Sequence, residues 1–125
     1  MGLQLLAIAL GGAVGAILRF GVSNGVYQWL GRGFPWGTLA VNVIGSLAMG
    51  FLTAMLVERL NVAPEIRAAV MTGGLGAFTT FSTFSIETLS LIEQGDVLKA
   101  GVNMLVSVLV CVSVCWLGLL LGRQL

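Results

Sequence analysis

Long apolar stretches alternate with short polar connections along the whole chain. Charged residues gather in the connections, and the apolar stretches contain few of them beyond Arg19 and Glu87. A helix needs roughly 20 mostly apolar residues to cross a bilayer. The pattern therefore predicts four membrane-spanning helices, at about Leu3–Leu30, Phe34–Val57, Pro64–Ile92 and Val97–Gly122.

The ends of these helices carry local signals. Pro35 and Pro64 suit the first turn of a helix, where a proline removes no intrahelical hydrogen bond. The apolar N-terminus lacks the positive region that opens a secretory signal, so it is expected to be the first span. No stretch remains for a soluble domain, and residues 1–125 are expected to form a single four-helix transmembrane domain.

Composition supports a membrane protein. Hydrophobic residues make up 58% of the chain and charged residues 9%, and the mean hydropathy is +1.04, whereas about a quarter of the residues of a soluble domain are charged. Neither an enzyme nor a nucleic-acid partner is expected; the partner is the lipid membrane. Cys111 and Cys115 lie four apart on one predicted helix, and we expect packing residues there, not a disulfide or a metal site.

The charges of the connections hardly favour one orientation. With four spans, Arg59, Arg67 and Arg123 share one side, and Arg32 and Lys99 share the other. Orientation follows the difference in Lys and Arg between the two sides, and three against two is almost no bias. Insertion in both directions is therefore expected to compete with a single orientation set by one charge or by partner contacts.

Four short-looped helices leave little interior volume for a pathway inside one subunit, so a polar site between subunits is expected. Symmetric homodimers are the commonest assembly. Insertion in both directions would make such a dimer antiparallel, with its two-fold axis in the membrane plane, as in inverted-repeat transporters.

Polar residues recur every fourth position on two of the predicted spans, so that each set lies on one helical face. The second span carries Thr38, Asn42 and Ser46, and the fourth carries Asn103, Ser107 and Cys111. Hydroxyls and amides often hold membrane helices together. Two such stripes beside a hydroxyl-rich third span favour a polar path over helix packing alone.

The third span contains residues that weaken a helix. Gly73, Gly74 and Gly76 are poor in helix interiors, and threonine hydroxyls follow them. A break between about Gly74 and Thr79 is expected, and the carbonyls of a broken helix are a recurrent cation site in transporters. The alternative is a continuous helix that uses its glycines for close packing.

Two phenylalanines follow this stretch. Phe81 and Phe84 are three apart on one face, among the hydroxyls of Thr80, Ser82, Thr83 and Ser85. An aromatic ring has a negative face and a positive edge, so two edges facing a path could stabilise a small anion without holding it tightly. The alternative is that both rings are ordinary packing residues.

Three motifs together resemble a known family. GGLGAFTTFSTFSIE (Gly73–Glu87), GTLAVNVIGSLAMG (Gly37–Gly50) and GGAVGAILRF (Gly11–Phe20) are similar to the Fluc, or CrcB, family of bacterial fluoride channels. The resemblance implies an antiparallel, dual-topology homodimer in the bacterial inner membrane. It also implies two pores through which cytoplasmic fluoride leaves passively, which lowers its toxicity.

The resemblance assigns roles to individual residues. Phe81 and Phe84 would present their ring edges to fluoride, and Asn42 would contribute an amide donor. The other residues expected to line or flank the route are Ser82, Thr83, Ser107, Glu87 and Asn103, the last at a position where some members have a tyrosine.

The family also holds a structural sodium ion at the dimer centre. By resemblance, the backbone carbonyls of Gly76 and Thr79 would bind it, and two subunits would supply four oxygens. Arg19 matches an arginine that members carry at the end of the first-span motif. It would attract anions, or it would snorkel or cap a helix end.

The competing hypothesis is a small, proton-coupled multidrug exporter of the four-helix, dual-topology type. Such a transporter needs a carboxylate within the membrane. The first span offers Arg19 and no acid, and only Glu87 could serve. A purely structural helix bundle would explain the glycines but not the array of phenylalanines and hydroxyls.

Overall fold

The computed structural model describes residues 1–125 and contains helices and connections only. The elements in chain order are α1 (Gly2–Leu30), α2 (Trp36–Leu52), η1 (Thr53–Arg59), α3 (Pro64–Arg67), η2 (Ala68–Leu75), α4 (Gly76–Phe78), α5 (Phe81–Glu93) and α6 (Val97–Gln124). The two η segments are π-helical continuations of their neighbours. The all-helical fold expected from the sequence is therefore observed.

Three of the four predicted spans are single helical runs that are long and apolar enough to cross a membrane: Gly2–Leu30, Trp36–Arg59 and Val97–Gln124. The third predicted span is a succession of shorter segments from Pro64 to Glu93. Pro64 occupies the first turn of α3, as predicted. Pro35 lies one position earlier than predicted, as the residue that precedes α2.

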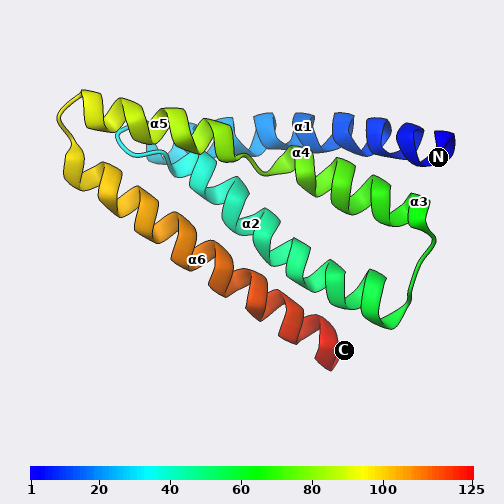
Figure 1. The fold of residues 1–125 in the computed structure, drawn as a ribbon. Helices are drawn as coiled ribbons and strands as arrows, with labels where there is room; N and C mark the ends of the chain where they lie inside the picture. Colours follow the sequence, from blue (N-terminus) through cyan, green and yellow to red (C-terminus); the bar gives the residue numbers. More distant parts are fainter.

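The helices alternate in direction (Figure 1). The N-terminus, the connection from η1 to α3 and the C-terminus lie at one end of the molecule, and the other two connections lie at the opposite end. Helix α6 runs alongside α2, while the segments from α3 to α4 run back along α1. Helix α5 then contacts α6, so residues from α2, α5 and α6 come together.

Glycines allow the closest helix contacts. A side chain at Gly11 or Gly15 of α1 would collide with the carbonyl oxygens of Ala69 and Gly74 in η2. Small residues let membrane helices approach until their backbones touch, which compensates for the absence of a hydrophobic driving force in lipid. Gly73 and Gly74 of the third predicted span thus serve helix packing, which was the alternative interpretation of that stretch.

The chain leaves the helical conformation just after these glycines. Helix α4 ends at Phe78, and Thr79 (φ −86°, ψ 160°) and Thr80 (φ −151°, ψ 122°) are extended before α5 begins at Phe81. Gly73, Gly74 and Gly76 themselves remain helical. The extended residues therefore lie at the C-terminal end of the stretch for which the sequence indicated a break.

Candidate functional site

Asn42 of α2 is bonded twice to the backbone of the extended segment. Its side-chain nitrogen donates to the carbonyl oxygen of Thr80 at 3.0 Å, and its side-chain oxygen accepts from the Thr80 amide at 2.8 Å. The carboxamide thereby replaces the partners that a helix would supply to Thr80, since backbone groups in an apolar surrounding must be satisfied within the protein. Asn42 fixes the position of the extended segment against α2.

The same break leaves the four carbonyls from Gly76 to Thr79 without their helical donors, and those of Gly76 and Thr79 are the two that the sequence singled out. In a continuous α-helix the amide of residue i+4 bonds the carbonyl of residue i. The amide of Thr80 goes to Asn42, so the carbonyl of Gly76 loses that partner. The amide of Thr83 goes to the hydroxyl of Thr80, which caps α5, so the carbonyl of Thr79 loses its partner as well.

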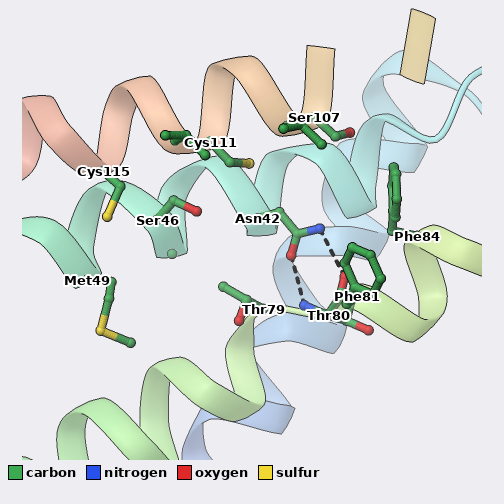
Figure 2. A pocket seen from close by; sticks show the side chains of 13 residues that line it. Asn42, Ser46, Met49, Thr79, Thr80, Phe81, Phe84, Ser107, Cys111 and Cys115 are labelled. Atoms are coloured by element: carbon green, nitrogen blue, oxygen red, sulfur yellow. Dashed lines mark hydrogen bonds between the residues drawn. The ribbon is translucent and has the colours of Figure 1, made fainter. Parts of the chain in front are cut away.

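A cavity of about 370 Å³ lies beside the extended segment, between α2, α5 and α6 (Figure 2). The α2 stripe contributes Asn42 and Ser46 to its wall, and the α6 stripe contributes Ser107 and Cys111. Two residues of each polar stripe predicted from the sequence therefore border one shared space, whereas Thr38 and Asn103 do not line it. No charged side chain lines this cavity.

Phe81 and Phe84 line one end of the cavity. Their ring centroids are 5.4 Å apart and the ring planes are inclined by 40°. Phe84 is buried, whereas the side of the cavity formed by Phe81 is open, with 76% of Phe81 exposed. Figure 2 shows both rings next to Asn42. The structure thus brings the predicted phenylalanine pair and the predicted amide donor to one place.

Asn103 and Ser107 belong to a buried chain of hydrogen bonds behind the phenylalanines. The Ser107 hydroxyl donates to Asn103, whose amide donates to the Thr88 hydroxyl at 2.8 Å. Thr88 in turn donates to the carbonyl oxygen of Phe84 at 2.7 Å. Asn103 is 1% exposed and does not line the cavity, so it positions Ser107 and Phe84.

Glu87 lies one turn beyond Phe84 in a second polar cluster. Its carboxylate accepts hydrogen bonds from the hydroxyls of Tyr27, at 2.8 Å, and Thr38. The guanidinium of Arg32 stacks on the Tyr27 ring at 4.3 Å from the ring centroid. A carboxylate near the membrane interior needs such partners, and here two uncharged donors supply them.

Arg19 lines a separate cavity of about 220 Å³ on the other side of the extended segment. Thr38, Thr80 and Thr83 also line it, and Thr80 borders both cavities. The predicted site residues Arg19 and Thr83 are therefore neighbours of the main cavity without lining it. Ser82 is exposed on α5 and lines neither space.

Sequence reasoning did not single out three residues that the structure places at the site. These residues are Tyr27, Thr88 and Met49. Tyr27 is the only tyrosine of the chain, and Glu87 as an intramembrane acid signals that a donor must exist. Nothing in the local pattern tells which residue supplies it, because Tyr27 and Glu87 are 60 positions apart.

A family model described as "CrcB-like protein, Camphor Resistance (CrcB)" matches residues 6–119. The chain belongs to the CrcB family. The family named from the three sequence motifs is thereby confirmed. The match covers both polar stripes, the extended segment and the phenylalanine pair, so the whole site lies within the family's shared region.

Several curated relatives of this chain share one name with each other. A protein of Methylococcus capsulatus called "Fluoride-specific ion channel FluC" is 59% identical over all 125 residues of this chain, which spans 55% of that relative's length. Proteins of the same name from Magnetococcus marinus and Hydrogenovibrio crunogenus are 54% and 49% identical; they match 97% and 98% of this chain, over 98% and 92% of their own lengths.

Proposed function

We propose that this chain is the subunit of a fluoride-selective channel that lets the anion cross a bacterial inner membrane passively. One observation carries the proposal beyond the family's name. A single uncharged cavity brings together the Phe81 and Phe84 rings, the Asn42 amide and the Ser107 hydroxyl. These groups offer positive ring edges and hydrogen-bond donors with no cation to trap the ion.

One donor remains free for an anion in this cavity, and a second can turn towards it. The Asn42 nitrogen carries two hydrogens and uses one of them on Thr80, so the second can point to the anion. The Ser107 hydroxyl rotates freely about its C–O bond, and an anion competes with Asn103 for its hydrogen. Fluoride is small and strongly hydrated, so several close donors must replace its water; larger halides fit less well and gain less from each donor.

The remaining predicted residues flank this route. Arg19, in the adjoining cavity across Thr80, raises the local concentration of anions without touching the main cavity. Glu87, held by Tyr27 and Thr38, borders the polar space at the other end of α5. Arg32, Lys99 and Asp96 also line this space. A route past Phe84 towards that space is the path that we assign to fluoride.

A second copy completes the site in this proposal. Phe81 is 76% exposed and Gly76 is also exposed, so one chain does not enclose the cavity or shield the extended segment from lipid. Lipid cannot satisfy free backbone carbonyls. In an antiparallel homodimer each subunit would cover this surface of the other, and the assembly would contain two equivalent pores.

The free carbonyls of Gly76 and Thr79 fit the structural sodium ion of such a dimer. Both have lost their helical donors, as described above, and both belong to the segment that a partner would cover. Carbonyl oxygens suit a hard cation, and unwound helix carbonyls hold Na⁺ in other transporters. Two copies would present four oxygens to one ion.

Removal of sodium is expected to weaken the dimer. Replacing Na⁺ by N-methylglucamine at equal ionic strength should lower the melting temperature in detergent, because a ligand bound only by the native assembly stabilises it, by about 2.7 kcal/mol at a hundredfold excess over its Kd. Thermal unfolding followed by size-exclusion chromatography measures this. Identical melting curves with and without Na⁺ would contradict the sodium site.

Insertion in both directions has its own expected outcome. A cysteine tag at the C-terminus of a chain lacking Cys111 and Cys115 should react with impermeant reagents from both faces of the membrane, with about half of the molecules in each orientation. Labelling in intact cells and in inverted vesicles measures the two fractions. Labelling from one face alone would rule out the antiparallel dimer.

Purified protein in liposomes tests the channel function directly. With a potassium ionophore present to balance the charge, we expect a fluoride gradient to drive efflux, detected with a fluoride electrode, with chloride flux smaller by at least about a hundredfold. Collapsing any proton gradient should leave the rate unchanged, whereas a proton-coupled exporter would stop. Comparable chloride flux, or a requirement for a proton gradient, would overturn the proposal.

A further inference from the structure

The end of the main cavity opposite the phenylalanines is lined by sulfur. Met49 of α2 and Cys111 and Cys115 of α6 all contribute to its wall. Both cysteines are free thiols. Figure 2 shows Met49 and Cys115 on the side of the cavity away from Phe81 and Phe84, with Cys111 between Cys115 and Ser107. The sequence predicts packing residues at Cys111 and Cys115, but the structure places them on the wall of the cavity that Asn42 and Ser107 also line.

The spacing of the two thiols suits a bridging metal ion. Residues four apart on a helix have Cβ atoms about 5–6 Å apart on the same face. Two metal–sulfur bonds of about 2.3 Å span a comparable distance when the ion lies between the sulfurs. Helix α6 therefore spaces the two Cβ atoms so that both sulfurs can reach one ion, and Met49 adds a thioether from the facing helix.

The ligand types select the kind of ion. Thiolate and thioether sulfurs prefer soft cations such as Cu⁺, whereas carboxylates and imidazoles are needed for most harder divalent ions. No carboxylate lines the cavity, and the chain contains no histidine. A soft monovalent cation is therefore the ion class that this wall fits.

We propose that Cys111, Cys115 and Met49 form a binding site for a soft, thiophilic monovalent cation such as Ag⁺ or Cu⁺. Each thiol that binds releases its proton to water, and its sulfur supplies the electron pair of the new bond. No oxidant or reductant takes part. Two thiolates and one monovalent cation leave one net negative charge in the cavity.

Binding at this site would block the route, and this second half of the inference rests on the proposed function. The ion occupies the same cavity as the phenylalanine pair and Ser107. A complex of net negative charge opposes the entry of a second anion at short range in an apolar surrounding. The block needs no change in the fold.

Silver ion added to the purified wild-type protein tests the site itself. In chloride-free buffer we expect about one bound silver per chain after desalting, measured by mass spectrometry of the metal. The Cys111→Ser, Cys115→Ser double variant should retain none, and Met49→Leu should bind at least about threefold more weakly. Met104→Leu, which removes a thioether outside the cavity, should bind as the wild type does. Equal silver in the wild type and the double variant would overturn the site.

Fluoride efflux from liposomes tests the block. The inhibited fraction is taken relative to each variant's own rate without silver, and the half-inhibiting concentration should rise by at least about tenfold in the double variant. A matched control adds Ser113→Cys, an exposed position on α6 outside the cavity, to the double variant. This control should bind silver without restoring the block.

The two measurements separate the possible failures. Block of equal potency in the wild type and the double variant would show that silver acts elsewhere and would overturn the blocking role. Absence of fluoride flux in every variant would contradict the proposed function, while the silver content would still decide whether the sulfur site exists.

Discussion

Replacing Phe81 or Phe84 by isoleucine is expected to reduce fluoride flux by about five- to thirtyfold for either single change, with a larger loss for the pair. Isoleucine retains an apolar side chain but has no ring edge. A desolvated cation over a ring face contributes about 1–2 kcal/mol. We take a similar value for an anion at the positive ring edge, because the same quadrupole acts there with the opposite sign. Each 1.36 kcal/mol in a barrier changes a rate tenfold.

The two positions are expected to differ in stability. Phe84 is 9% exposed and packs beneath Phe81, so its replacement should also lower the melting temperature, whereas the exposed Phe81 should tolerate the change within the isolated subunit. Large-to-small changes in a packed interior leave cavities, and exposed positions do not. Phe81→Ile is therefore the cleaner test of the anion contact.

Phe51→Ile provides the matched control, because Phe51 lies on α2 and lines no part of the cavity. It should conduct fluoride as the wild type does. Liposome efflux and size-exclusion chromatography of the same samples separate lost conduction from lost assembly. Unchanged flux in both Phe81→Ile and Phe84→Ile would mean that the rings serve only packing.

Asn42→Ala is expected to reduce both stability and flux. The change leaves the amide and the carbonyl of Thr80 without partners, and an unsatisfied buried polar group costs about 1–3 kcal/mol. The extended segment would lose its attachment to α2, and the cavity would lose a donor. We expect a lower melting temperature and at least a tenfold loss of fluoride efflux, roughly 1.4 kcal/mol in the barrier.

Asn42→Asp separates the two roles of this side chain. The carboxylate still accepts from the Thr80 amide, so stability should lie between those of the wild type and Asn42→Ala. It offers no donor to an anion and adds a negative charge, so flux should be as low as in Asn42→Ala.

Thr53→Val is the matched control for Asn42, because it removes a hydroxyl that bonds its own helix at Met49, away from the extended segment. Its effect on flux should be small. Flux in Asn42→Asp equal to that of the wild type would show that Asn42 only supports the backbone.

Much of the membrane arrangement follows from the sequence alone. Runs of about 20 apolar residues with polar breaks specify the number of spans and their approximate limits. The bilayer thickness sets the length of a spanning helix, and the absence of water requires the backbone to form its hydrogen bonds within that helix. The periodicity of 3.6 residues placed Asn42 with Ser46, and Ser107 with Cys111, on single helical faces. The motif around Phe81 and Phe84 was specific enough to indicate the CrcB family, which the family match confirms.

The tertiary structure decided which faces meet and where the backbone opens. Helix propensity placed weakness at Gly74, but packing against α1 keeps that glycine helical, and the extended residues are Thr79 and Thr80. The cause is a side chain from another helix, since Asn42 satisfies the backbone of Thr80 across 38 positions of sequence.

Partners from distant segments leave no trace in local periodicity. The Tyr27 hydroxyl that bonds Glu87 comes from a helix 60 residues earlier, and the facing of Met49 with Cys111 depends on how α2 packs against α6. The sequence determined helices and their polar faces because these depend on residues a few positions apart. The cavity, its donors and its sulfur-lined end depend on packing between helices, and only the tertiary structure could place them.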